Sequence, residues 1–319
     1  MFYLKLRMYL LLTIMFALIY MIITVIGVSI GIVNFYFYLF ISLFMIFIQY
    51  LVGPKIVEWS MRVRYVDEKD APQLHQMVED LAKRAGIPKP KVGIARINIP
   101  NAFAFGRGIS DGRVCVTQSL MHLLNDSELR AVLGHEISHL KNRDVITITL
   151  LSVIPIVLYR IAWHFMWFGQ SRRQREGTNT VFVGLIAFIF YFITNLLVLY
   201  ASRIREYFAD RGSIMLGNRP NSLASALYKL VYGSVRTDKE ELREVEGIKA
   251  FFVNDPTKAI NELQELSQLD LNRDGIIDNK ELELISRKRV NISFADKLLE
   301  LLSTHPNMLK RIKQLSQYR

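Results

Sequence analysis

Long apolar stretches occur twice in pairs along the chain, and the segments between them alternate apolar and polar positions at helical or strand spacing. The first pair covers residues 8–28 and 32–52, and the second pair covers residues 145–168 and 181–201. Each stretch is long enough to cross the hydrocarbon core of a bilayer, which is about 30 Å thick. This pattern predicts a mainly α-helical integral membrane protein with about four transmembrane helices, arranged as two hairpins.

Basic residues flank the first predicted hairpin on both sides and indicate its orientation. Lys5 and Arg7 precede the hairpin, and Lys55, Arg62 and Arg64 follow it. Positively charged residues next to transmembrane segments are retained on the cytoplasmic side. We therefore expect both ends of the hairpin, and the polar segment that follows it, to lie in the cytoplasm.

The second predicted hairpin is less regular than the first. Its first stretch contains Pro155, Arg160 and His164, and the link to the next stretch contains a basic cluster over residues 172–175. Full transmembrane helices require Arg160 to reach the membrane interface with its long side chain, whereas a shallow pair would be partly buried in protein. The length of the apolar stretches favours full spans.

The composition agrees with a membrane protein that presents basic surfaces. The chain of 319 residues is 51% hydrophobic and has a formal net charge of +11. It contains no zinc knuckle, no RNP-like aromatic motif and no helix-turn-helix cue, so the charge indicates phospholipid headgroups rather than nucleic acid as the partner. A single cysteine, Cys115, excludes a disulfide framework within the chain.

Residues 67–144 have the pattern of a soluble segment with helices and short strands. A helix is predicted at the start of the segment and ends at Gly86. Short β-like pieces follow, separated by glycine-containing turns, at residues 91–95, 101–105 and 113–117. A second helix is predicted at about 126–142, because Asn125 and Glu128 form a capping-box pattern before an apolar stripe. We therefore expect an α+β domain with a small sheet.

The second of these helices carries the motif His135-Glu136-Ile137-Ser138-His139. Histidines four residues apart lie on one face of a helix, one turn apart, so both imidazoles can bind a single metal ion. Glu136 lies beside the pair, where its carboxylate can contact a water at the metal without binding the metal itself. The motif predicts the zinc site of a metalloprotease, provided that a third ligand is present.

The fourth apolar stretch ends in Arg203-Ile204-Arg205-Glu206-Tyr207-Phe208-Ala209-Asp210. The helix with the histidine pair runs into the third stretch, and the fourth stretch returns to the same side of the membrane. We therefore expect Glu206 to emerge beside His135 and His139 and to serve as the third zinc ligand. Asp210, one turn further on, can hydrogen-bond a ligating imidazole. Without the histidine motif, Glu206 would be interpreted as a solvated charge beside two arginines.

Residues 270–281 match the twelve-residue loop of an EF-hand, with Gly275 at the sixth position. The pattern predicts a site for Ca2+ or Mg2+, and the alternative is a polar turn between two helices. The predicted ligands are Asp270, Asn272, Asp274, Ile276 through its backbone carbonyl, Asp278 and Glu281. EF-hands usually occur in pairs, so a single loop is as compatible with a structural clip as with a sensor.

Together these motifs resemble the HtpX family of membrane-embedded zinc metalloproteases, which is related to the CAAX prenyl endopeptidases. The matching stretches occur in the family's order, at residues 101–106, 128–144, 205–210, 304–306 and 311–312. Residues 236–290, which include the EF-hand-like loop, fall outside the family pattern. The resemblance implies a zincin-type catalytic domain in which the histidine pair and Glu206 bind one zinc ion. Glu136 would then be the general base, and Asp210 would support a ligating imidazole.

The resemblance also implies roles for residues whose chemistry the sequence alone does not reveal. His305 and Arg311 match a C-terminal motif of the family that lies near the zinc and helps to steady the transition state. Three residues would lie on an edge strand beside the cleft, where an extended substrate binds by β-augmentation. These residues are Asn101, Ala102 and Phe103.

The function implied by the resemblance is quality control and stress response at the plasma membrane. The enzyme would hydrolyse misfolded or damaged membrane proteins at the cytoplasmic face, so its partners are membrane-protein substrates and the lipid bilayer. Transmembrane hairpins are expected at residues 1–54 and 145–202. Cytoplasmic catalytic parts are expected at residues 55–144 and 203–319.

Other functions fit parts of the sequence. A CAAX-type prenyl-protein endopeptidase would need a large closed chamber within the membrane, for which about four spans are too few. A calcium-responsive membrane adaptor with a silent protease site would use the EF-hand-like loop, but every expected zinc and base residue is present. A further hypothesis links the two sites, because cation binding at residues 270–281 would order the segment that carries His305.

Overall fold

The computed structural model describes most of the chain outside its N-terminal stretch and three internal segments, which begin at residues 145, 236 and 288. The described residues are 35–144, 180–235, 269–272, 274–287 and 300–318, with further single residues at 146–147, 151, 154–155, 158–159, 162 and 266. The predicted span at 8–28, most of the predicted span at 145–168, and the basic link at 172–175 lie outside the described residues.

The chain divides into two compact units. The helical unit combines Met1–Leu51 with Ile146–Ile204, and the sheet unit combines Val52–Val145 with Arg205–Arg319. Because two separate stretches build each unit, residues far apart in the sequence meet in the same core.

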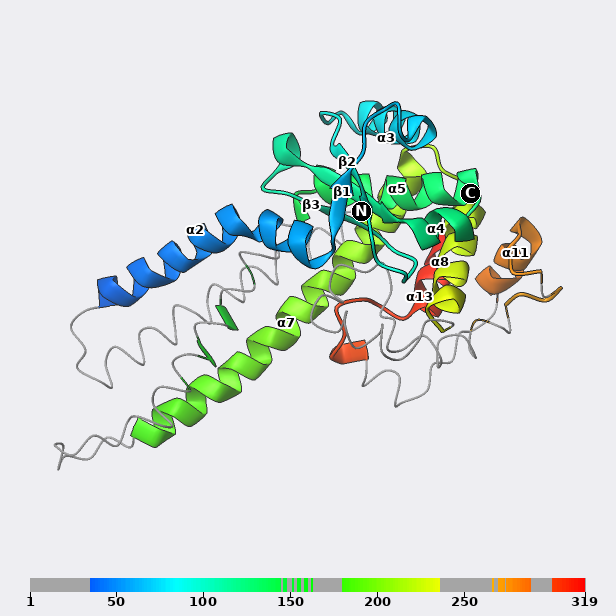
Figure 1. Ribbon diagram of the computed structural model, residues 1–319. Coiled ribbons are helices and arrows are strands. Elements are labelled where there is room, and N and C mark those ends of the chain that lie inside the picture. Colours follow the sequence, from blue (N-terminus) through cyan, green and yellow to red (C-terminus); the bar gives the residue numbers. More distant parts are fainter. Residues whose placement is uncertain are drawn as a thin grey trace. The chain divides into compact units, whose positions relative to one another are not determined.

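Two long helices, α2 (Phe35–Ser60) and α7 (Thr180–Met215), supply most of the described part of the helical unit (Figure 1). Among the described helices, one is long and apolar enough to cross a membrane, over Phe182–Met215. It contains most of the span predicted at 181–201, whereas the predicted total of about four spans stays a prediction. Helix α2 covers most of the span predicted at 32–52 and continues beyond it to Ser60.

Four strands form the sheet of the sheet unit, in the order β1-β2-β4-β3 (Figure 1). The strands are β1 (Val63–Tyr65), β2 (Lys91–Ala95), β3 (Ala102–Phe105) and β4 (Arg113–Thr117). Strands β2 and β4 pair in parallel, while β1 and β3 pair antiparallel with them at the two sides. Strand β3 is therefore an edge strand, with Ala102 opposite Val116. The prediction of a small sheet is confirmed, and β1 is a strand that the sequence did not indicate.

Helix α5 (Asp126–Lys141) is central to the sheet unit. It packs against α3 (Pro72–Ala85) and α8 (Pro220–Val235), and it also contacts strands β3 and β4. The apolar stripe of α5 is buried, at Leu129, Val132, Leu133, Ile137 and Leu140. The predicted capping box fixes its start, because Asn125 Oδ1 accepts the Glu128 N–H and Glu128 Oε2 accepts the Asn125 N–H, both at 3.0 Å.

Shorter elements complete the described part of the sheet unit. They are η1 (Ile109–Asp111), α4 (Gln118–Leu123), α11 (Asn279–Arg287) and α13 (Met308–Leu315). Helix α13 packs against α8 and α11, and it places Met308, Leu309, Ile312 and Leu315 in the core. This apolar anchoring brings the C-terminal part of the chain into the interior, and Arg311 with it.

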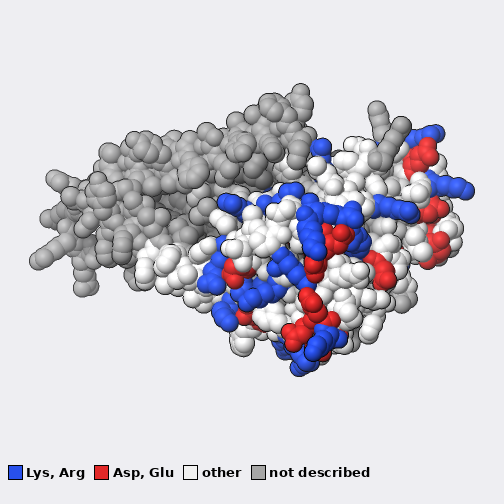
Figure 2. Space-filling view, turned by 90° about the horizontal axis from the view of Figure 1, so that it is seen from above, with Lys and Arg blue, Asp and Glu red and all other residues white. Residues whose placement is uncertain are grey.

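On the face seen in Figure 2, basic side chains are spread over the described residues, with acidic side chains among them. On α3, Lys83 contacts Glu79 at 2.7 Å and Arg84 contacts Asp80 at 3.0 Å. Exposed ion pairs of this kind contribute only about 0–1 kcal/mol to stability. The net charge of +11 is therefore a surplus of basic residues on a surface that carries both signs.

Candidate metal centre

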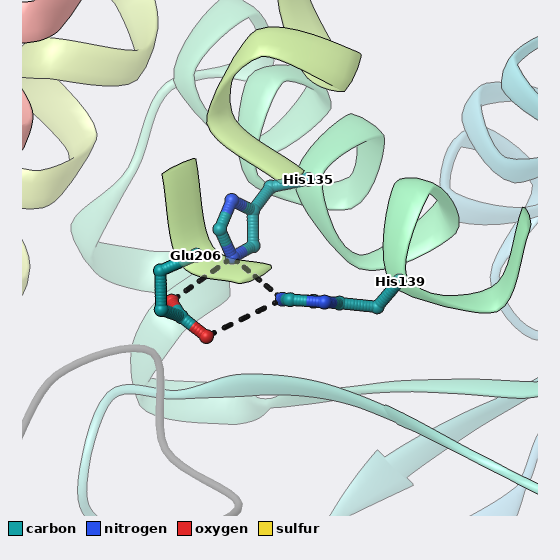
Figure 3. Close-up of side chains that lie close together, drawn as sticks. All are labelled: His135, His139 and Glu206. Carbon is teal, nitrogen blue, oxygen red and sulfur yellow. Dashed lines mark hydrogen bonds and ion pairs between the residues drawn. The ribbon is translucent and has the colours of Figure 1, made fainter. Parts of the chain in front are cut away.

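The three predicted metal ligands come together where α5 meets α7. His135 and His139 point from one face of α5 toward Glu206 of α7 (Figure 3). Nε2 of His135 lies 3.1 Å from Nε2 of His139, and each of these nitrogens lies 3.5 Å from a different oxygen of the Glu206 carboxylate. One ligand atom from each residue lies within 4.8 Å of the others. The three donors thus surround a space that suits one metal ion.

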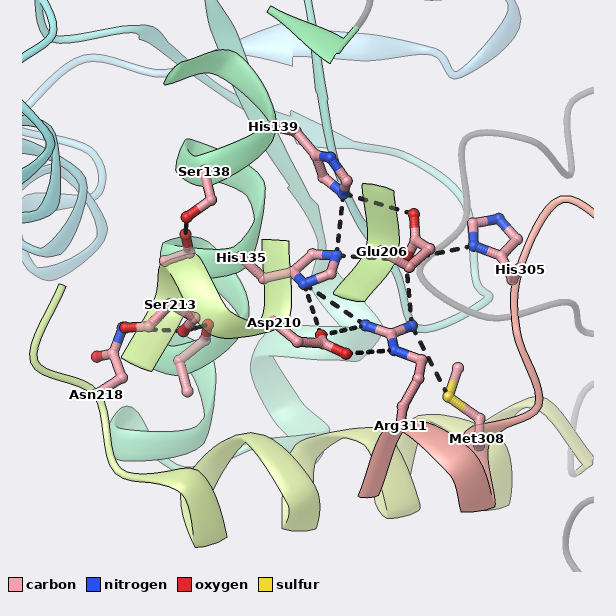
Figure 4. A network of polar contacts seen from close by, with 12 residues as sticks. His135, Ser138, His139, Glu206, Asp210, Ser213, Asn218, His305, Met308 and Arg311 are labelled. Atoms are coloured by element: carbon pink, nitrogen blue, oxygen red, sulfur yellow. Dashed lines mark hydrogen bonds and ion pairs between the residues drawn. The ribbon is translucent and has the colours of Figure 1, made fainter. Parts of the chain in front are cut away.

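Asp210 and Arg311 contact two of these ligands, His135 and Glu206 (Figure 4). Asp210 Oδ1 lies 2.9 Å from His135 Nδ1, which leaves His135 Nε2 directed toward the other donors. Arg311 donates to both Asp210 oxygens, through Nε at 2.9 Å and Nη2 at 2.6 Å, and its Nη1 lies 3.2 Å from Glu206 Oε2. The Arg311 side chain is 0% exposed, so its charge is balanced by these two carboxylates and not by water.

The carboxylates of Asp210 and Glu206 stabilise positive charge within the cluster. Burial by itself lowers the pKa of His135, because the imidazolium ion loses its water. Hydrogen bonds to Asp210 and Glu206 outweigh this effect and raise the pKa of His135 to about 9. The surroundings therefore stabilise a cation at this imidazole, whether it is a proton or a metal ion.

Glu136 lies next to the cluster, between α5 and the edge strand β3. Its side chain is buried. Burial raises the pKa of Glu136, while the charges of His135 and His139 and a hydrogen bond from the backbone of Ala104 oppose that change. Because Ala104 is part of β3, the carboxylate of Glu136 contacts the strand that was predicted to hold substrate.

His305 approaches the cluster from the segment before α13 (Figure 4). Its Nδ1 lies 3.5 Å from Glu206 Oε2. Both ring nitrogens of His305 are buried without a hydrogen bond among the described residues, and Glu206 Oε2 is buried with ion-pair contacts but no hydrogen bond of good geometry. Buried polar atoms almost always have partners, so these atoms indicate a site that receives a polar or ionic ligand. Two imidazoles and one carboxylate are also a donor set of catalytic zinc sites, and the residues present therefore fit a metal ion.

Asp144 was not singled out in the sequence, but it contacts the second histidine. Asp144 Oδ2 lies 2.6 Å from His139 Nδ1, and the Asp144 side chain is largely buried. Its backbone carbonyl accepts a hydrogen bond from Arg205 Nη1 at 2.9 Å. The one available signal was an acidic residue just past the end of the metal-binding helix, five positions after His139.

Small residues let α5 and α7 approach closely enough to join the ligands. A Cβ atom at Gly212 would lie 2.3 Å from Ser138 Oγ, and a Cβ atom at Gly134 would lie 2.9 Å from Ser213 Oγ. Ser213 Oγ also donates to the backbone carbonyl of Ala131 at 2.6 Å, which ties α7 to α5 (Figure 4). Larger side chains at either glycine would separate the helix with the histidines from the helix with Glu206.

The three predicted substrate-binding residues lie at and just before β3, with their side chains buried. Asn101 is 0% exposed, Ala102 is 1% exposed and Phe103 is 3% exposed. The Asn101 N–H donates to Thr117 Oγ1 at 2.9 Å. Phe103 packs in a core cluster with Val57. These residues present no exposed side chain, so pairing with another chain by β-augmentation would have to use the backbone of the edge strand.

In the EF-hand-like loop, the side-chain oxygen atoms accept hydrogen bonds from the loop's own backbone. Asp270 accepts the N–H groups of Asp274 and Gly275 at 3.2 and 2.9 Å. Glu281 accepts the N–H groups of Leu271 and Asp278 at 2.7 and 3.0 Å. Further loop bonds join Asn272 Oδ1 to the Asp274 N–H, Asp274 Oδ1 to the Ile276 N–H, and Asp278 Oδ1 to the Glu281 N–H. Within the described part of the chain, three His, Cys, Asp or Glu donors gather within 4.8 Å at the histidine cluster and not in this loop.

Comparison with known proteins relates this arrangement to a peptidase family. A profile of Peptidase family M48 matches residues 68–319. A protease HtpX homolog from Methanothermobacter thermautotrophicus is 54% identical over 228 residues, which cover 72% of this chain and 86% of the relative. Protease HtpX homolog 2 from Methanosarcina mazei is 42% identical over 217 residues, which cover 67% of this chain and 74% of the relative.

Among solved structures, S. mikatae Ste24p is similar to this chain, with a TM-score of 0.52 and 16% sequence identity. The match covers 100% of this chain and 67% of that structure, and at this identity it shows the fold alone. The family profile, by contrast, matches well over half of the chain, including the histidine motif and Glu206. The chain therefore belongs to peptidase family M48, with proteases of the HtpX type among its relatives, and it is a metalloprotease.

Proposed function

We propose that this metalloprotease is a zinc endopeptidase that cleaves misfolded or damaged membrane proteins at the cytoplasmic face of the plasma membrane. One observation carries the catalytic part of the proposal: the two histidines, Glu206 and the buried Glu136 share one site. The apolar helix over Phe182–Met215 supports a place in the membrane. The substrate class and the role in quality control rest on the resemblance to the HtpX family.

The donor set supports zinc as the metal. Two imidazoles and one carboxylate supply three protein ligands, and catalytic zinc sites keep a further position open for water or substrate. Zinc, when bound, supplies Lewis-acid polarisation of the scissile carbonyl and of the attacking water. Asp210 on His135 Nδ1 directs His135 Nε2 toward the metal, as carboxylate partners of zinc-binding imidazoles commonly do.

Glu136 is placed to move the proton that peptide hydrolysis requires. It takes the proton of the attacking water and passes it to the nitrogen of the leaving amine, so that the peptide bond breaks. Its contact with the backbone of Ala104 places the carboxylate beside the edge strand, where an extended substrate would lie. We propose that the backbone of Asn101, Ala102 and Phe103 pairs with that substrate by β-augmentation.

His305 and Arg311 would contribute in different ways. His305 has ring nitrogens without partners beside Glu206, so it can donate a hydrogen bond to the oxyanion that develops on the scissile carbonyl. Arg311 is fully buried on Asp210 and Glu206. We therefore propose that Arg311 steadies the transition state indirectly, by holding the carboxylates that orient the metal ligands.

The test of the function compares the wild-type chain with Glu136→Gln, both purified in detergent. Zinc content and cleavage of an unfolded membrane protein are measured on the same samples. We expect about one zinc ion per chain in both proteins, and a loss of cleavage of about 10²–10⁴-fold in the variant. Glu79→Gln, on the exposed face of α3, is the matched control and should cleave like wild type.

The outcomes separate the parts of the proposal. Full cleavage by Glu136→Gln would show that Glu136 is not the base, and absence of zinc from the wild-type protein would remove the zinc assignment. His305→Ala in the same assay should keep zinc and lower kcat by about 10²–10³-fold, the usual effect of losing one oxyanion donor. An unchanged kcat would exclude His305 from the chemistry.

We also propose that residues 270–281 bind Ca2+ or Mg2+, as their spacing predicts. Support comes from the position of the loop, because Ser225 Oγ on α8 bonds both the N–H and the carbonyl of Ile277, at 2.9 and 3.1 Å. The test adds CaCl2 or MgCl2 to zinc-loaded protein and follows thermal unfolding. A rise in Tm for wild type and not for Glu281→Gln would support the site, whereas no rise in wild type would exclude it. Cleavage followed in the same titration tests the link to His305.

A further inference from the structure

We infer that Asp144 is a positioning residue for the metal centre, with its carboxylate fixing the orientation and tautomer of His139. The inference rests on the proposed function, because it takes the histidine cluster to hold a metal ion. The sequence motifs assigned no role to Asp144, which lies just beyond the end of α5. Three observations carry the inference: a short buried contact, a strained turn and a second anchor on α7.

The first observation is the contact itself. Asp144 Oδ2 lies 2.6 Å from His139 Nδ1. Because Nδ1 donates to this carboxylate, Nε2 is the nitrogen that carries a free lone pair, and it faces His135 and Glu206. Asp210 makes the same kind of contact with His135 Nδ1 at 2.9 Å. Each histidine of the motif thus has its own aspartate on the nitrogen that points away from the cluster.

The second observation is the backbone between His139 and Asp144. Helix α5 ends at Lys141, and Arg143 has a φ of +56°, in the left-handed region that residues with a Cβ atom rarely adopt. After this turn Asp144 lies beside the last turn of α5, where its carboxylate contacts His139. Strained residues of this kind cluster at functional sites, where the surrounding structure holds them in place.

The third observation is the anchor on α7. Arg205 Nη1 donates to the backbone carbonyl of Asp144 at 2.9 Å, and Arg205 directly precedes Glu206 in the chain. The turn that carries Asp144 is therefore tied to the helix that carries the third ligand. An ordinary ion pair at the end of a helix would be exposed, whereas the Asp144 residue is 6% exposed.

The experiment measures zinc affinity of the full-length protein in detergent, by competition with a chromogenic zinc chelator. Asp144→Ala should weaken zinc binding about 10–100-fold, the usual effect of removing the partner of a ligating histidine. Asp144→Asn should lose less, because an amide oxygen still accepts the His139 N–H. Asp80→Ala is the matched control, since Asp80 pairs with Arg84 on α3 and with Arg130 on α5, so that the substitution removes an ion pair of the histidine-bearing helix without contacting the cluster.

Three further measurements separate positioning from general destabilisation. Arg143→Gly should keep wild-type zinc affinity, because glycine adopts the left-handed conformation without strain. The Co2+-substituted proteins should show an altered visible absorption spectrum in Asp144→Ala and an unaltered one in Asp80→Ala. Thermal unfolding of the metal-free proteins reports any loss of fold that does not depend on the metal.

The results distinguish failure of the inference from failure of the proposed function. Zinc bound with equal affinity by wild type and Asp144→Ala, with the same Co2+ spectrum, would overturn the positioning role alone. A wild-type protein that binds no zinc would overturn the proposed function, and the inference with it. Weaker binding by the folded Asp144→Ala protein, together with the altered spectrum, would establish the role.

Discussion

At the junction of α5 and α7, the carboxylates of Glu206 and Asp210 face three imidazoles and a guanidinium, whereas in the loop over residues 270–281 the carboxylates face backbone N–H groups. Both regions belong to the sheet unit, and both were predicted from sequence as cation sites. Their residues have similar chemistry. What differs is the source of the groups that orient the oxygens.

In the histidine cluster, the orienting groups come from other elements. Arg311 of α13 and Asp210 of α7 hold the donors His135 and Glu206, and all four of these side chains are buried. In the loop, Asp270 and Glu281 are oriented by the loop's own backbone. Preorganised donors lose little freedom when a cation binds, so we expect the cluster to bind metal more tightly than the loop.

The two regions are also attached to the core in different ways. The cluster connects three elements that lie far apart in the sequence, so a change at one of them alters the position of the others. The loop is continuous in sequence and contacts α8 through Ser225 and through Tyr228, whose hydroxyl bonds Asp270. We therefore expect substitutions in the cluster to cost more stability than substitutions in the loop, and to affect zinc binding as well.

The largest effect is expected when the buried arginine is removed. Arg311→Met leaves the Asp210 and Glu206 carboxylates buried without their cation, which should lower the free energy of unfolding by about 3–5 kcal/mol. Arg287→Met, beside the loop, removes an exposed ion pair with Glu283 at 2.6 Å and should cost at most about 1 kcal/mol. Urea unfolding followed by tryptophan fluorescence measures both. A similar loss of unfolding free energy in the two variants would contradict the view that Arg311 stabilises the cluster through Asp210 and Glu206.

A smaller effect is expected from two glycines, one in each region. Gly212→Ala places a Cβ atom 2.3 Å from Ser138 Oγ, so it should cost about 1–3 kcal/mol and weaken zinc binding by separating α7 from α5. Gly275→Ala meets no atom within 4 Å, but its φ is +80°, so it should cost about 1–2 kcal/mol and leave zinc binding unchanged.

A second substitution sharpens this test. Ser138→Gly removes the atoms that a Cβ at position 212 would meet, and by itself it costs about 1 kcal/mol as a glycine in a helix. In the Gly212→Ala background it should restore zinc affinity and recover part of the stability. If the losses of the two single variants simply add in the double variant, the contact between positions 138 and 212 is not the cause of the weaker zinc binding.

The sequence was most informative where the chemistry depends on local geometry. The histidine pair follows from the period of one helix, and the start of α5 follows from the capping box of Asn125 and Glu128. Glu206 required more, because its place beside the histidines depends on how α7 crosses α5. Periodicity does not reveal that crossing, whereas the return of the fourth apolar stretch to the same side of the membrane and the family resemblance both indicate it.

The supporting contacts could not be predicted, for physical reasons. The bidentate contact of Arg311 with Asp210 joins residues 101 positions apart, and it depends on the packing of α13. Asp144 reaches His139 only because Arg143 adopts a left-handed conformation, and arginine carries no sequence signal for that conformation. The same limit applies to Gly134 and Gly212, whose spacing within their helices does not show that Gly134 meets Ser213 and Gly212 meets Ser138.

The smallest effect in this series is expected at Ser225, where the loop is attached to α8. Ser225→Ala removes the hydroxyl that bonds the N–H and the carbonyl of Ile277, and it should cost about 1 kcal/mol. Because Ser225 contacts none of the zinc ligands, zinc affinity should stay at the wild-type value. Ser222→Ala, on the same helix, is the matched control. A drop in zinc affinity with Ser225→Ala alone would mean that the loop and the cluster are coupled through α8. The zinc affinity of the histidine cluster would then depend on the attachment of the loop to α8, and the two regions would be coupled rather than independent.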